Sequence, residues 1–296
     1  MLPREKFDHF NPGRDPFERI EPQLRLGDLK PRFSGSPKLS FMISTYNRKG
    51  QLARSLECLA RQEWKEFEVL IMDDGSKQDL SSLFEMFNVY LQLKTFKAER
   101  TAWRSCPSRA YKTMLEHVSG EVICIMHPEI MLHHTAAKTI YDGCIKKIKG
   151  TYYCIDENDK PTRGAWKWIS LRPMFIHIDM QPKLDEVDWH TDVHNVQKYP
   201  EFMQMGGFAG RPNIWHFTKE TYPWWFVGAA KRECPIWEDM PIIDGHGIID
   251  MWMISYRKVK HFTDVTPNGV LCYHQAHQTS AVAPEGEQVS EKVQIK

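Results

Sequence analysis

The apolar residues in the first third of the chain switch between unbroken runs and helical spacing. Residues 39–44 (LSFMIS) and 67–72 (FEVLIM) are short, mainly apolar runs, as expected of strands buried on both faces of a parallel sheet. Between them, residues 50–61 repeat leucine at intervals of four and three, which predicts an amphipathic helix. The pattern therefore predicts a strand, a helix and a parallel strand. Open sheets of this kind bind ligands at the carboxyl ends of their strands.

Each of the two predicted strands ends in a short polar segment. Residues 44–48 (STYNR) close the first strand, and residues 73–76 (DDGS) follow the second. Neither GxGxxG nor GxxxxGKS/T follows the first strand, which argues against a dinucleotide site and a P-loop. The two polar segments at this spacing resemble the nucleotide-sugar half of a family 2 glycosyltransferase of the GT-A fold. An ordinary strand–helix–strand unit with a polar rim is the alternative.

The resemblance implies a fold and a domain organisation. The expected fold is α/β of the GT-A type, with a Rossmann-like, mostly parallel sheet flanked by helices in a single catalytic domain. We expect this domain to span residues 38–280, with the nucleotide-sugar half at 38–130 and the acceptor half at 131–280. An extended, proline-rich arm (1–37) precedes it, and a flexible polar tail (281–296) follows it.

The resemblance also implies how a nucleoside-diphosphate-sugar donor is held. Tyr46 would pack on the base, Asp74 would hydrogen-bond the base or the ribose, and Asp73 would support Asp74. An arginine, Arg104 or Arg109, would approach the diphosphate, because guanidinium groups pair well with phosphate oxygens. The full set of expected donor-binding residues is Ser44, Thr45, Tyr46, Arg48, Asp73, Asp74, Arg104 and Arg109.

The next stretch keeps the family's order of elements. The apolar spacing predicts a helix over 80–87, a strand over 90–98 and a buried strand over 121–126. Pro107 is expected to open a further helix, a position that proline favours. That helix is expected to end near Ser119–Gly120, where glycine signals a C-cap.

His-Pro-Glu at 127–129 follows the buried strand, where the family has an Asp-x-Asp motif. In the family these carboxylates bind a divalent cation that bridges the donor's diphosphate. Glu129 keeps the second carboxylate and His127 replaces the first, a pair that suits Mn²⁺ better than Mg²⁺. Several relatives add a histidine after the last strand, which indicates His274, with His277 in reserve. Histidines that bind no metal are the alternative.

A second resemblance lies in the C-terminal half, to a motif shared by many family 2 enzymes and the animal galactosyltransferases. A Gly-Gly segment at 206–207 precedes DGHGIID at 244–250, in which Gly245 and Gly247 align with the glycines of the motif. Asp250 then falls on the position of the family's catalytic base. The resemblance therefore implies that Asp250 takes a proton from the acceptor.

Other residues of this half depart from the motif. Ile249, His246 and Trp252 stand where the family has Glu, Trp and Asp. Asp250 could instead be an acid stabilised at a helix start, and Asp244 is the reserve base. The residues expected on the acceptor side are Trp224, Trp225 and His246, and core packing is an alternative for the tryptophans.

The remaining pattern is less regular. Residues 134–149 predict an amphipathic helix, and residues 152–155 and 168–178 predict strands. His190 and His194 stand four apart, a metal-ligand spacing on a helix, but no third partner lies nearby in the sequence. A structural or surface role is therefore favoured for this pair.

Composition narrows the classes of function. The chain of 296 residues is 42% hydrophobic, enough for a full core. Its 39 Lys and Arg nearly balance its 38 Asp and Glu, so charge gives no case for nucleic acid as the main partner. No run of eighteen apolar residues exists, so we expect no transmembrane segment and a cytoplasmic location. Seven cysteines without CxxC pairs indicate reduced thiols, and the ten tryptophans suit sugar binding.

The resemblance thus implies an inverting glycosyltransferase that uses a divalent cation and a UDP-sugar donor. The acceptor would be a glycan or another hydroxyl compound. A sugar nucleotidyltransferase is disfavoured, because STYNRKG is not the Gly-rich, Arg-containing loop of that class. Two alternatives stay open: a non-catalytic nucleotide-sugar or glycan binder, and a transferase acting on hydroxylated bases of phage-type DNA. Basic residues keep the nucleic-acid acceptor open: Lys146, Lys147, Lys149, Lys258 and Lys260.

Overall fold

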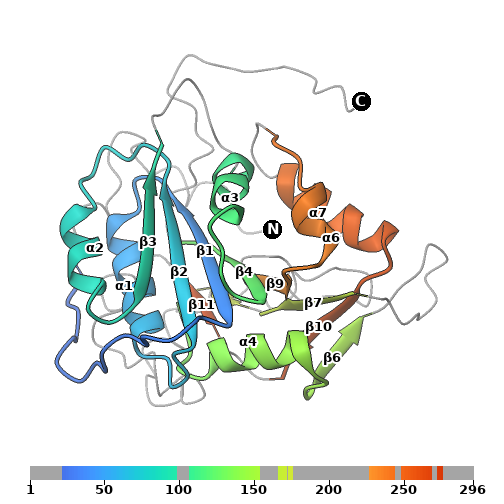
Figure 1. Ribbon diagram of the computed structural model, residues 1–296, viewed down its shortest axis with the longest axis horizontal. Coiled ribbons are helices and arrows are strands. Elements are labelled where there is room, and N and C mark those ends of the chain that lie inside the picture. Colours follow the sequence, from blue (N-terminus) through green and yellow to red (C-terminus); the bar gives the residue numbers. More distant parts are fainter. Residues whose placement is uncertain are drawn as a thin grey trace, which may run out of the picture.

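The apolar runs of the sequence form neighbouring strands of one sheet (Figure 1). The computed structural model describes residues 22–98, 107–153, 166–171, 173–175, 227–243, 248–268 and 272–275. Within these ranges an eight-stranded sheet has the order β3-β2-β1-β4-β9-β7-β10-β6, and a three-stranded sheet has the order β5-β11-β8.

The strands of the large sheet are β1 (Leu39–Thr45), β2 (Phe67–Asp73), β3 (Gln92–Lys97), β4 (Val122–Met126), β6 (Gly150–Tyr153), β7 (Lys167–Ser170), β9 (Val227–Lys231) and β10 (Thr263–Pro267). The small sheet contains β5 (Ile130–Leu132), β8 (Pro173–Phe175) and β11 (Cys272–His274). The helices are α1 (Lys49–Ala60), α2 (Ser81–Phe87), α3 (Ser108–Leu115), α4 (Ala136–Ile145), α6 (Pro235–Asp239) and α7 (Ile248–Val259).

The large sheet is mostly parallel, as the strand–helix–strand pattern predicts. β1 pairs in parallel with β2 and β4, and β2 pairs in parallel with β3. β9 is antiparallel to β4 and β7, and β6 is antiparallel to β10. The register sets Thr45 opposite Asp73 and Met42 opposite Ile125. The polar segments after β1, β2 and β4 therefore meet at one edge of the sheet.

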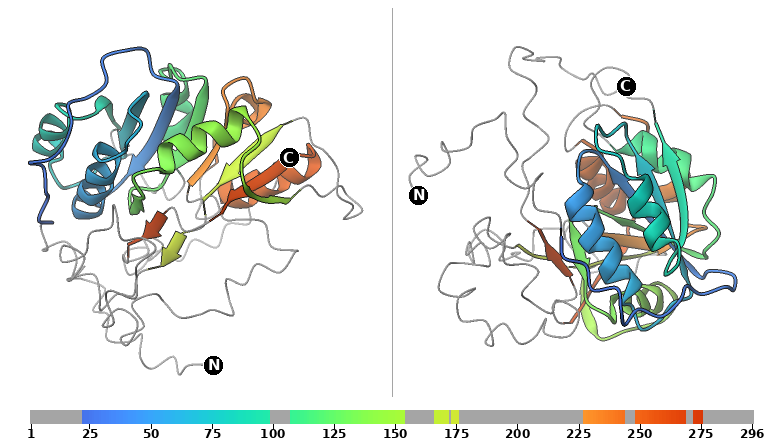
Figure 2. Two further views of the ribbon diagram at one scale, coloured as in Figure 1. Left: turned by 90° about the horizontal axis from the view of Figure 1, so that it is seen from below. Right: turned by 90° about the vertical axis from the view of Figure 1, so that its left-hand side faces the viewer.

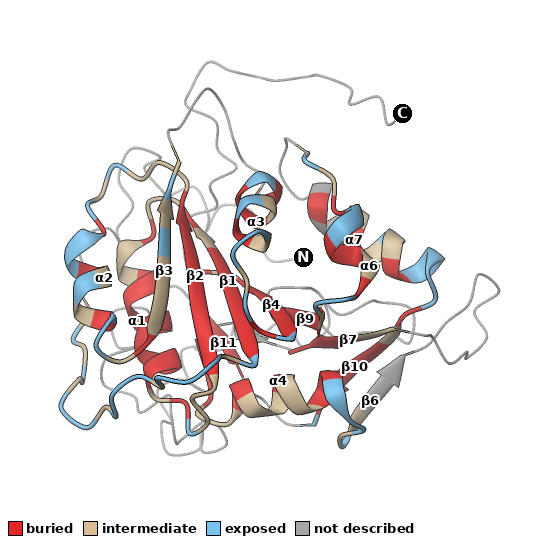
Figure 3. Cartoon of the chain, viewed as in Figure 1, coloured by how far each residue is buried: buried red, intermediate tan, exposed pale blue. Residues whose placement is uncertain are grey.

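Alternate residues of the central strands face two separate hydrophobic cores, because successive side chains of a strand point to opposite faces. Phe41 and Ile43 pack with residues of α1, α2 and α4. Met42 packs with residues of α3, α6 and α7. Figure 3 shows β1 and β2 buried along most of their length, as expected of strands covered on both faces.

Several predicted boundaries are wrong. The helix expected over 134–149 is α4, which ends at Ile145; that side chain is 40% exposed. Lys146 is already extended, with ψ of 174°, so the basic residues beyond it are not helical. The strand expected over 168–178 is two strands, β7 and β8, which belong to different sheets. β5, β9, α6 and β10 were not predicted, because each is only three to five residues long.

The C-cap role expected for Gly120 is also wrong. α3 ends at Leu115, well before this glycine. A Cβ at Gly120 would lie 2.8 Å from the carbonyl carbon of Leu39 and 2.8 Å from the backbone nitrogen of Ser40. Glycine is therefore needed here because the chain passes close to the start of β1 as it enters β4.

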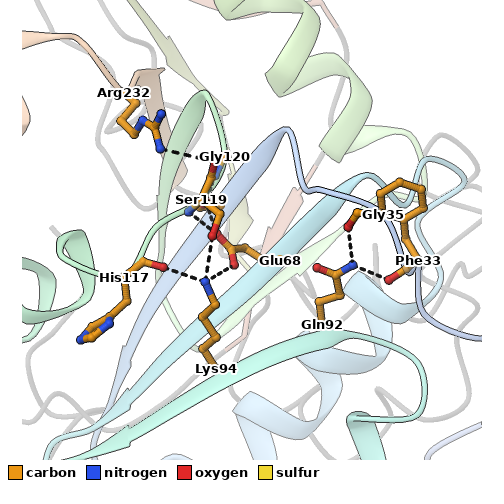
Figure 4. Close-up of polar contacts among 10 residues, drawn as sticks. Phe33, Gly35, Glu68, Gln92, Lys94, His117, Ser119, Gly120 and Arg232 are labelled. Atoms are coloured by element: carbon orange, nitrogen blue, oxygen red, sulfur yellow. Dashed lines mark hydrogen bonds and ion pairs between the residues drawn. The ribbon is translucent and has the colours of Figure 1, made fainter.

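A buried carboxylate ties the amino ends of the central strands together (Figure 4). Glu68 of β2 is 1% exposed, and its Oε1 accepts hydrogen bonds from Ser40 Oγ at 2.7 Å and from the Ser119 amide at 2.6 Å. Lys94 of β3 lies 2.7 Å from Glu68 Oε2 and also donates to the His117 carbonyl at 2.8 Å. These contacts hold β1, β2 and β3 at the edge opposite the polar segments.

Residues 22–37 run along the domain and contact its first core. Leu24, Leu26 and Leu29 pack against that core. The Arg32 amide donates to the Val89 carbonyl at 3.1 Å, so the segment is also joined to the turn before β3. The described part of the expected arm thus contributes apolar surface to the domain.

The cysteines in the described ranges are reduced and inaccessible. Five of them, Cys58, Cys124, Cys144, Cys234 and Cys272, are buried free thiols. Burial raises the pKa of each thiol above its ordinary value. Across the same ranges, no helix is both long enough and apolar enough to cross a membrane.

Candidate functional site

Two loops at the carboxyl ends of β1 and β2 are joined by reciprocal hydrogen bonds. The Asp74 amide donates to the Thr45 carbonyl at 2.9 Å, which continues the pairing of the strands. Beyond it, the Asn47 amide donates to Ser76 Oγ at 2.9 Å, and the Lys77 amide donates to Asn47 Oδ1 at 2.8 Å. The two polar segments singled out in the sequence are therefore joined into one hydrogen-bonded unit.

The conformation of this unit depends on two left-handed residues. Asn47 has φ of 51° and Gly75 has φ of 81°. Glycine adopts positive φ freely, and asparagine is among the few other residues that tolerate it. Sequence analysis did not single out Asn47, although an asparagine followed by a helix start is a signal for such a turn. A second missed residue is Gln78, whose Oε1 accepts from the Lys49 amide at 3.0 Å at the start of α1.

The two aspartates of DDGS have different surroundings. Asp73 is 4% exposed, and its Oδ1 accepts a hydrogen bond from the Ser76 amide at 2.8 Å. Its carboxylate therefore shapes the turn, which agrees with the supporting position expected for it. Asp74 is less buried than Asp73 and lies at the rim of the same edge. Asp74 is therefore the better placed of the two to meet a ligand.

The residues that end β1 range from buried to partly exposed. Thr45 is 2% exposed, and its Oγ1 has no hydrogen-bond partner among the described residues. Arg48 is 8% exposed, whereas Ser44 and Tyr46 are partly exposed. A buried hydroxyl without a partner is costly, so Thr45 is a candidate to hydrogen-bond a ligand at this edge.

The start of α3 connects this edge to the C-terminal half. Arg109 is exposed in the first turn of α3. Beside it, Ser108 is fully buried, and its Oγ contacts both the amide and the carbonyl of Ile243 at 2.9 Å. The described segment 227–243 therefore ends beside the helix that carries Arg109, and the DGHG residues that follow Ile243 lie outside the described residues. The other candidate arginine, Arg104, lies outside the described residues.

The three predicted metal ligands come together. Glu129 Oε1 lies 3.4 Å from His127 Nδ1 and 3.4 Å from His274 Nε2. The pairing of β5 with β11 causes this contact, because it sets His274 opposite Ile130, the residue after Glu129. Glu129 and His274 are largely buried, and the His127 side chain is 22% exposed. Residues more than 140 positions apart in the sequence thus form one polar cluster.

The donor atoms of this cluster suit a divalent cation, because two imidazoles and a carboxylate are acceptable ligands for Mn²⁺. Ligands of one ion lie about 2.0–2.6 Å from it, so two neighbouring ligand atoms are roughly 3–3.7 Å apart. The distances of 3.4 Å from Glu129 Oε1 to both rings are compatible with that spacing. As they stand, however, the described residues contain no group of three or more His, Cys, Asp or Glu side chains that could hold a metal ion.

The proposed base lies on a helix that starts in the second core. Asp250 is in the first turn of α7, and its side chain is not among those described. The preceding residue, Ile249, is 1% exposed and packs in the core formed with α3 and α6. An isoleucine therefore suits the position where the galactosyltransferase-like motif has Glu. Other predicted residues lie outside the described ranges: Asp244, His246, Trp224, Trp225, His190, His194 and His277.

Comparison with known proteins supports a glycosyltransferase origin. The hyaluronan synthase of Pasteurella multocida is 28% identical over 127 residues, which is 42% of this chain and 13% of the synthase. The validoxylamine A glucosyltransferase of Streptomyces hygroscopicus subsp. jinggangensis is 24% identical over 231 residues, 72% of this chain and 52% of that enzyme. The chain therefore spans about half or less of these relatives.

A solved structure has the same fold. The crystal structure of S. aureus TarS in complex with UDP superposes with a TM-score of 0.50 at 13% identity. The match covers 81% of this chain and 60% of that chain, so the mixed α/β fold is of the GT-A type. The model of the family described as "Glycosyl transferase family 2" matches residues 40–191, just over half of the sequence. The chain belongs to glycosyl transferase family 2.

Proposed function

We propose that this protein transfers a sugar from a nucleoside-diphosphate-sugar, preferentially a UDP-sugar, to an acceptor hydroxyl. One observation carries the proposal: the joined loops after β1 and β2 and the His127–Glu129–His274 cluster lie at the same edge of the sheet. A donor placed along that edge would contact the joined loops with its nucleoside and the His127–Glu129–His274 cluster with its diphosphate. Family membership supports a nucleotide-sugar donor, and the UDP bound to TarS favours a UDP-sugar.

The residues of the joined loops would bind the nucleoside. Tyr46, partly exposed, would pack on the base, and Asp74 at the rim would accept hydrogen bonds from the base or the ribose. The Thr45 hydroxyl, which has no partner among the described residues, would find one in the ligand. Arg109, exposed at the start of α3, would approach the diphosphate, where a guanidinium can donate two parallel hydrogen bonds.

His127, Glu129 and His274 would hold a divalent cation, with Mn²⁺ favoured over Mg²⁺ by the two imidazoles. When bound, the cation supplies positive charge near the leaving diphosphate. The protein's own contribution is to keep the carboxylate and both rings in a largely buried cluster, where electrostatic interactions are stronger than in water.

Asp250 would act as the general base. It would take the proton from the acceptor hydroxyl while that oxygen attacks the anomeric carbon and the bond to the diphosphate breaks. A single displacement of this kind inverts the anomeric configuration. Trp224, Trp225 and His246 are proposed to line the acceptor side.

The test is donor hydrolysis and thermal shift with UDP-, GDP- and TDP-sugars, each with Mn²⁺, Mg²⁺ or a chelator. We expect UDP-sugar to raise Tm most, because a ligand at about 100 times its Kd stabilises the folded state by about 2.7 kcal/mol. Hydrolysis should require the metal. Asp250→Asn should keep the thermal shift and lower turnover by about 100-fold or more.

The matched control is Asp142→Asn, because Asp142 is an acid on α4 that pairs with Lys138 and Lys146 away from the site. It should have wild-type turnover. Wild-type turnover in Asp250→Asn would remove Asp250 as the base. A thermal shift with UDP-sugar but no turnover under any condition would favour a non-catalytic nucleotide-sugar binder. This is the second candidate, because the described residues contain no group of three or more side chains that could hold a metal ion as they stand.

A further inference from the structure

The helix α1 has a polar face that is buried. Gln51 is 5% exposed and Ser55 is fully buried, although neither belongs to the leucine face that packs on the large sheet. On this side α1 packs against β5 of the small sheet. Buried polar side chains are normally hydrogen-bonded, so the partners of these residues show what the face is for.

The partners are backbone atoms of the His-Pro-Glu segment. Ser55 Oγ lies 2.6 Å from the Pro128 carbonyl oxygen and 3.0 Å from the Gln51 carbonyl oxygen. The hydroxyl has a single proton, and the shorter distance favours donation to Pro128. Gln275 Nε2 donates to the Glu129 carbonyl at 3.2 Å and to the Gln51 carbonyl at 3.1 Å. The backbone amide of Gln275 also donates to the Glu129 carbonyl, at 3.0 Å.

Glu129 is therefore held at its side chain and at its backbone by two consecutive residues. His274 contacts the Glu129 carboxylate, and Gln275 donates to the Glu129 backbone carbonyl. Gln275 is fully buried, as is Ser55, so water cannot replace their hydrogen bonds without opening the structure. The carboxylate position is set jointly by α1 and by the segment after β11.

We propose that Gln275 and Ser55 are positioning residues that fix Glu129 for cation binding, an inference that rests on the proposed function. Both residues would act through the backbone of Pro128 and Glu129 and not by touching the cation or the donor. Their effect is on the distance and direction of the Glu129 carboxylate relative to His127 and His274. Groups that orient metal ligands in this way typically change metal affinity by about 10- to 100-fold when removed.

The chain offers a matched control just beyond the end of the same helix. Gln62 is 2% exposed, and its Nε2 donates to the Cys58 carbonyl at 3.0 Å and the His133 carbonyl at 2.8 Å. Its Oε1 accepts from the Ala137 amide at 2.8 Å. Like Gln275, it is a buried amide that joins α1 to a neighbouring segment, but it lies beyond the opposite end of the helix from Gln51.

The experiment compares Gln275→Met with Gln62→Met and the wild type. Free Mn²⁺ is measured by electron paramagnetic resonance as the protein is titrated with Mn²⁺ in the presence of UDP. We expect the Mn²⁺ Kd to rise by about 10- to 100-fold in Gln275→Met and to change less than about twofold in Gln62→Met. UDP affinity measured with a chelator present should be the same in all three proteins, because the nucleoside loops are untouched.

Ser55→Ala provides a second, smaller perturbation that leaves the Pro128 carbonyl without its donor. Ser55→Ala should also raise the Mn²⁺ Kd. If Gln275→Met does not fold, the Mn²⁺ Kd of Ser55→Ala tests the inference in its place. Equal Mn²⁺ affinity in wild type and in the folded variants would overturn the inference alone. No Mn²⁺ uptake by the wild type with UDP would overturn the proposed cation site and, with it, the inference.

Discussion

At the scale of single residues, Asn47 joins the two loops that are proposed to bind the nucleoside. Its left-handed backbone turns the chain from β1 into α1, and its amide and side chain bind Ser76 and the Lys77 amide. Tyr46 and Asp74, the residues proposed to meet the nucleoside, flank these contacts. Loss of the asparagine would therefore disturb nucleoside binding without removing any group that touches the donor.

We expect Asn47→Gly to weaken UDP binding by roughly three- to tenfold, because it keeps the positive φ but loses a hydrogen bond worth about 0.5–1.5 kcal/mol. Asn47→Ala should weaken it further, since a left-handed conformation costs an L-residue about 1–2 kcal/mol more. Isothermal titration with UDP measures both. His261→Ala is the control, because His261 also has a positive φ, 52°, but joins α7 to β10. If His261→Ala weakens UDP binding as much as Asn47→Ala, the effect is global stability.

Many residues of the candidate site could be predicted because they lie at the ends of strands. Thr45, Asp73 and Glu129 follow apolar runs that the sequence makes visible, and parallel pairing brings such ends together. The local sequence carries a signal for the turn at Asn47, but not for its hydrogen bonds to Ser76 and Lys77. Gln275 could not be predicted, because its importance lies in hydrogen bonds to the Gln51 and Glu129 carbonyls of distant segments. Nothing in the local sequence indicates which carbonyl a buried amide will meet.

At the scale of elements, α7 is anchored to the sheet by a buried ion pair. Arg257 Nη1 lies 3.1 Å from Asp264 Oδ1 of β10, and the two side chains are 0% and 2% exposed. The Arg257 guanidinium carbon is also 4.9 Å from the centre of the Trp168 ring on β7. Burial raises the pKa of Asp264 to about 6, and Arg257 opposes that shift. The pair holds the C-terminal end of the helix whose first turn contains Asp250.

We expect Arg257→Met to be less stable than the wild type by about 3–5 kcal/mol at pH 8, because a buried carboxylate is left without its partner. The deficit should shrink as pH falls toward 6 and level off below it. Arg257 lowers the pKa of Asp264, so in the variant that pKa rises further and the buried carboxyl takes a proton at a higher pH than in the wild type, where its pKa is about 6. Urea unfolding from pH 4 to pH 8 measures the deficit, and one that does not vary with pH would contradict the assignment.

The elements of the nucleotide-sugar half were predicted better than those of the acceptor half, for a physical reason. β1 and β2 are seven residues long and apolar throughout most of their length, so the period of the pattern is clear. β10 reads TDVTP and contains a buried aspartate and a proline, which conceal it. The buried aspartate of β10 is paired with Arg257 on α7, and a partner on another element cannot be recognised from the sequence of the strand alone.

At the scale of the whole molecule, residues 22–37 extend the first core beyond the sheet and its helices. Leu24, Leu26 and Leu29 are partly buried against it. The Gln92 side chain donates to the Gly35 carbonyl at 3.0 Å, a second link between this segment and β3 (Figure 4). The segment should therefore unfold together with the domain, as one cooperative unit.

We expect the triple variant Leu24→Ala, Leu26→Ala and Leu29→Ala to lose about 2–4 kcal/mol, since each leucine is only partly buried. Urea unfolding should show a lower midpoint with an unchanged m-value. Val89→Ala is the control, because Val89 lies beside the segment but is 59% exposed and should change stability by less than about 0.5 kcal/mol. A triple variant as stable as this control would mean that the segment is not part of the cooperative unit.

The buried cysteines give the molecule a built-in set of reporters. Cys58 lies on α1, Cys124 on β4, Cys144 on α4, Cys234 just before α6 and Cys272 on β11. Because burial raises their pKa values and shields them, the reactive thiolate is scarce while the protein is folded. Alkylation under native conditions must then wait for each element to open. The order in which these thiols are modified would rank the local stability of both cores and of the small sheet, residue by residue.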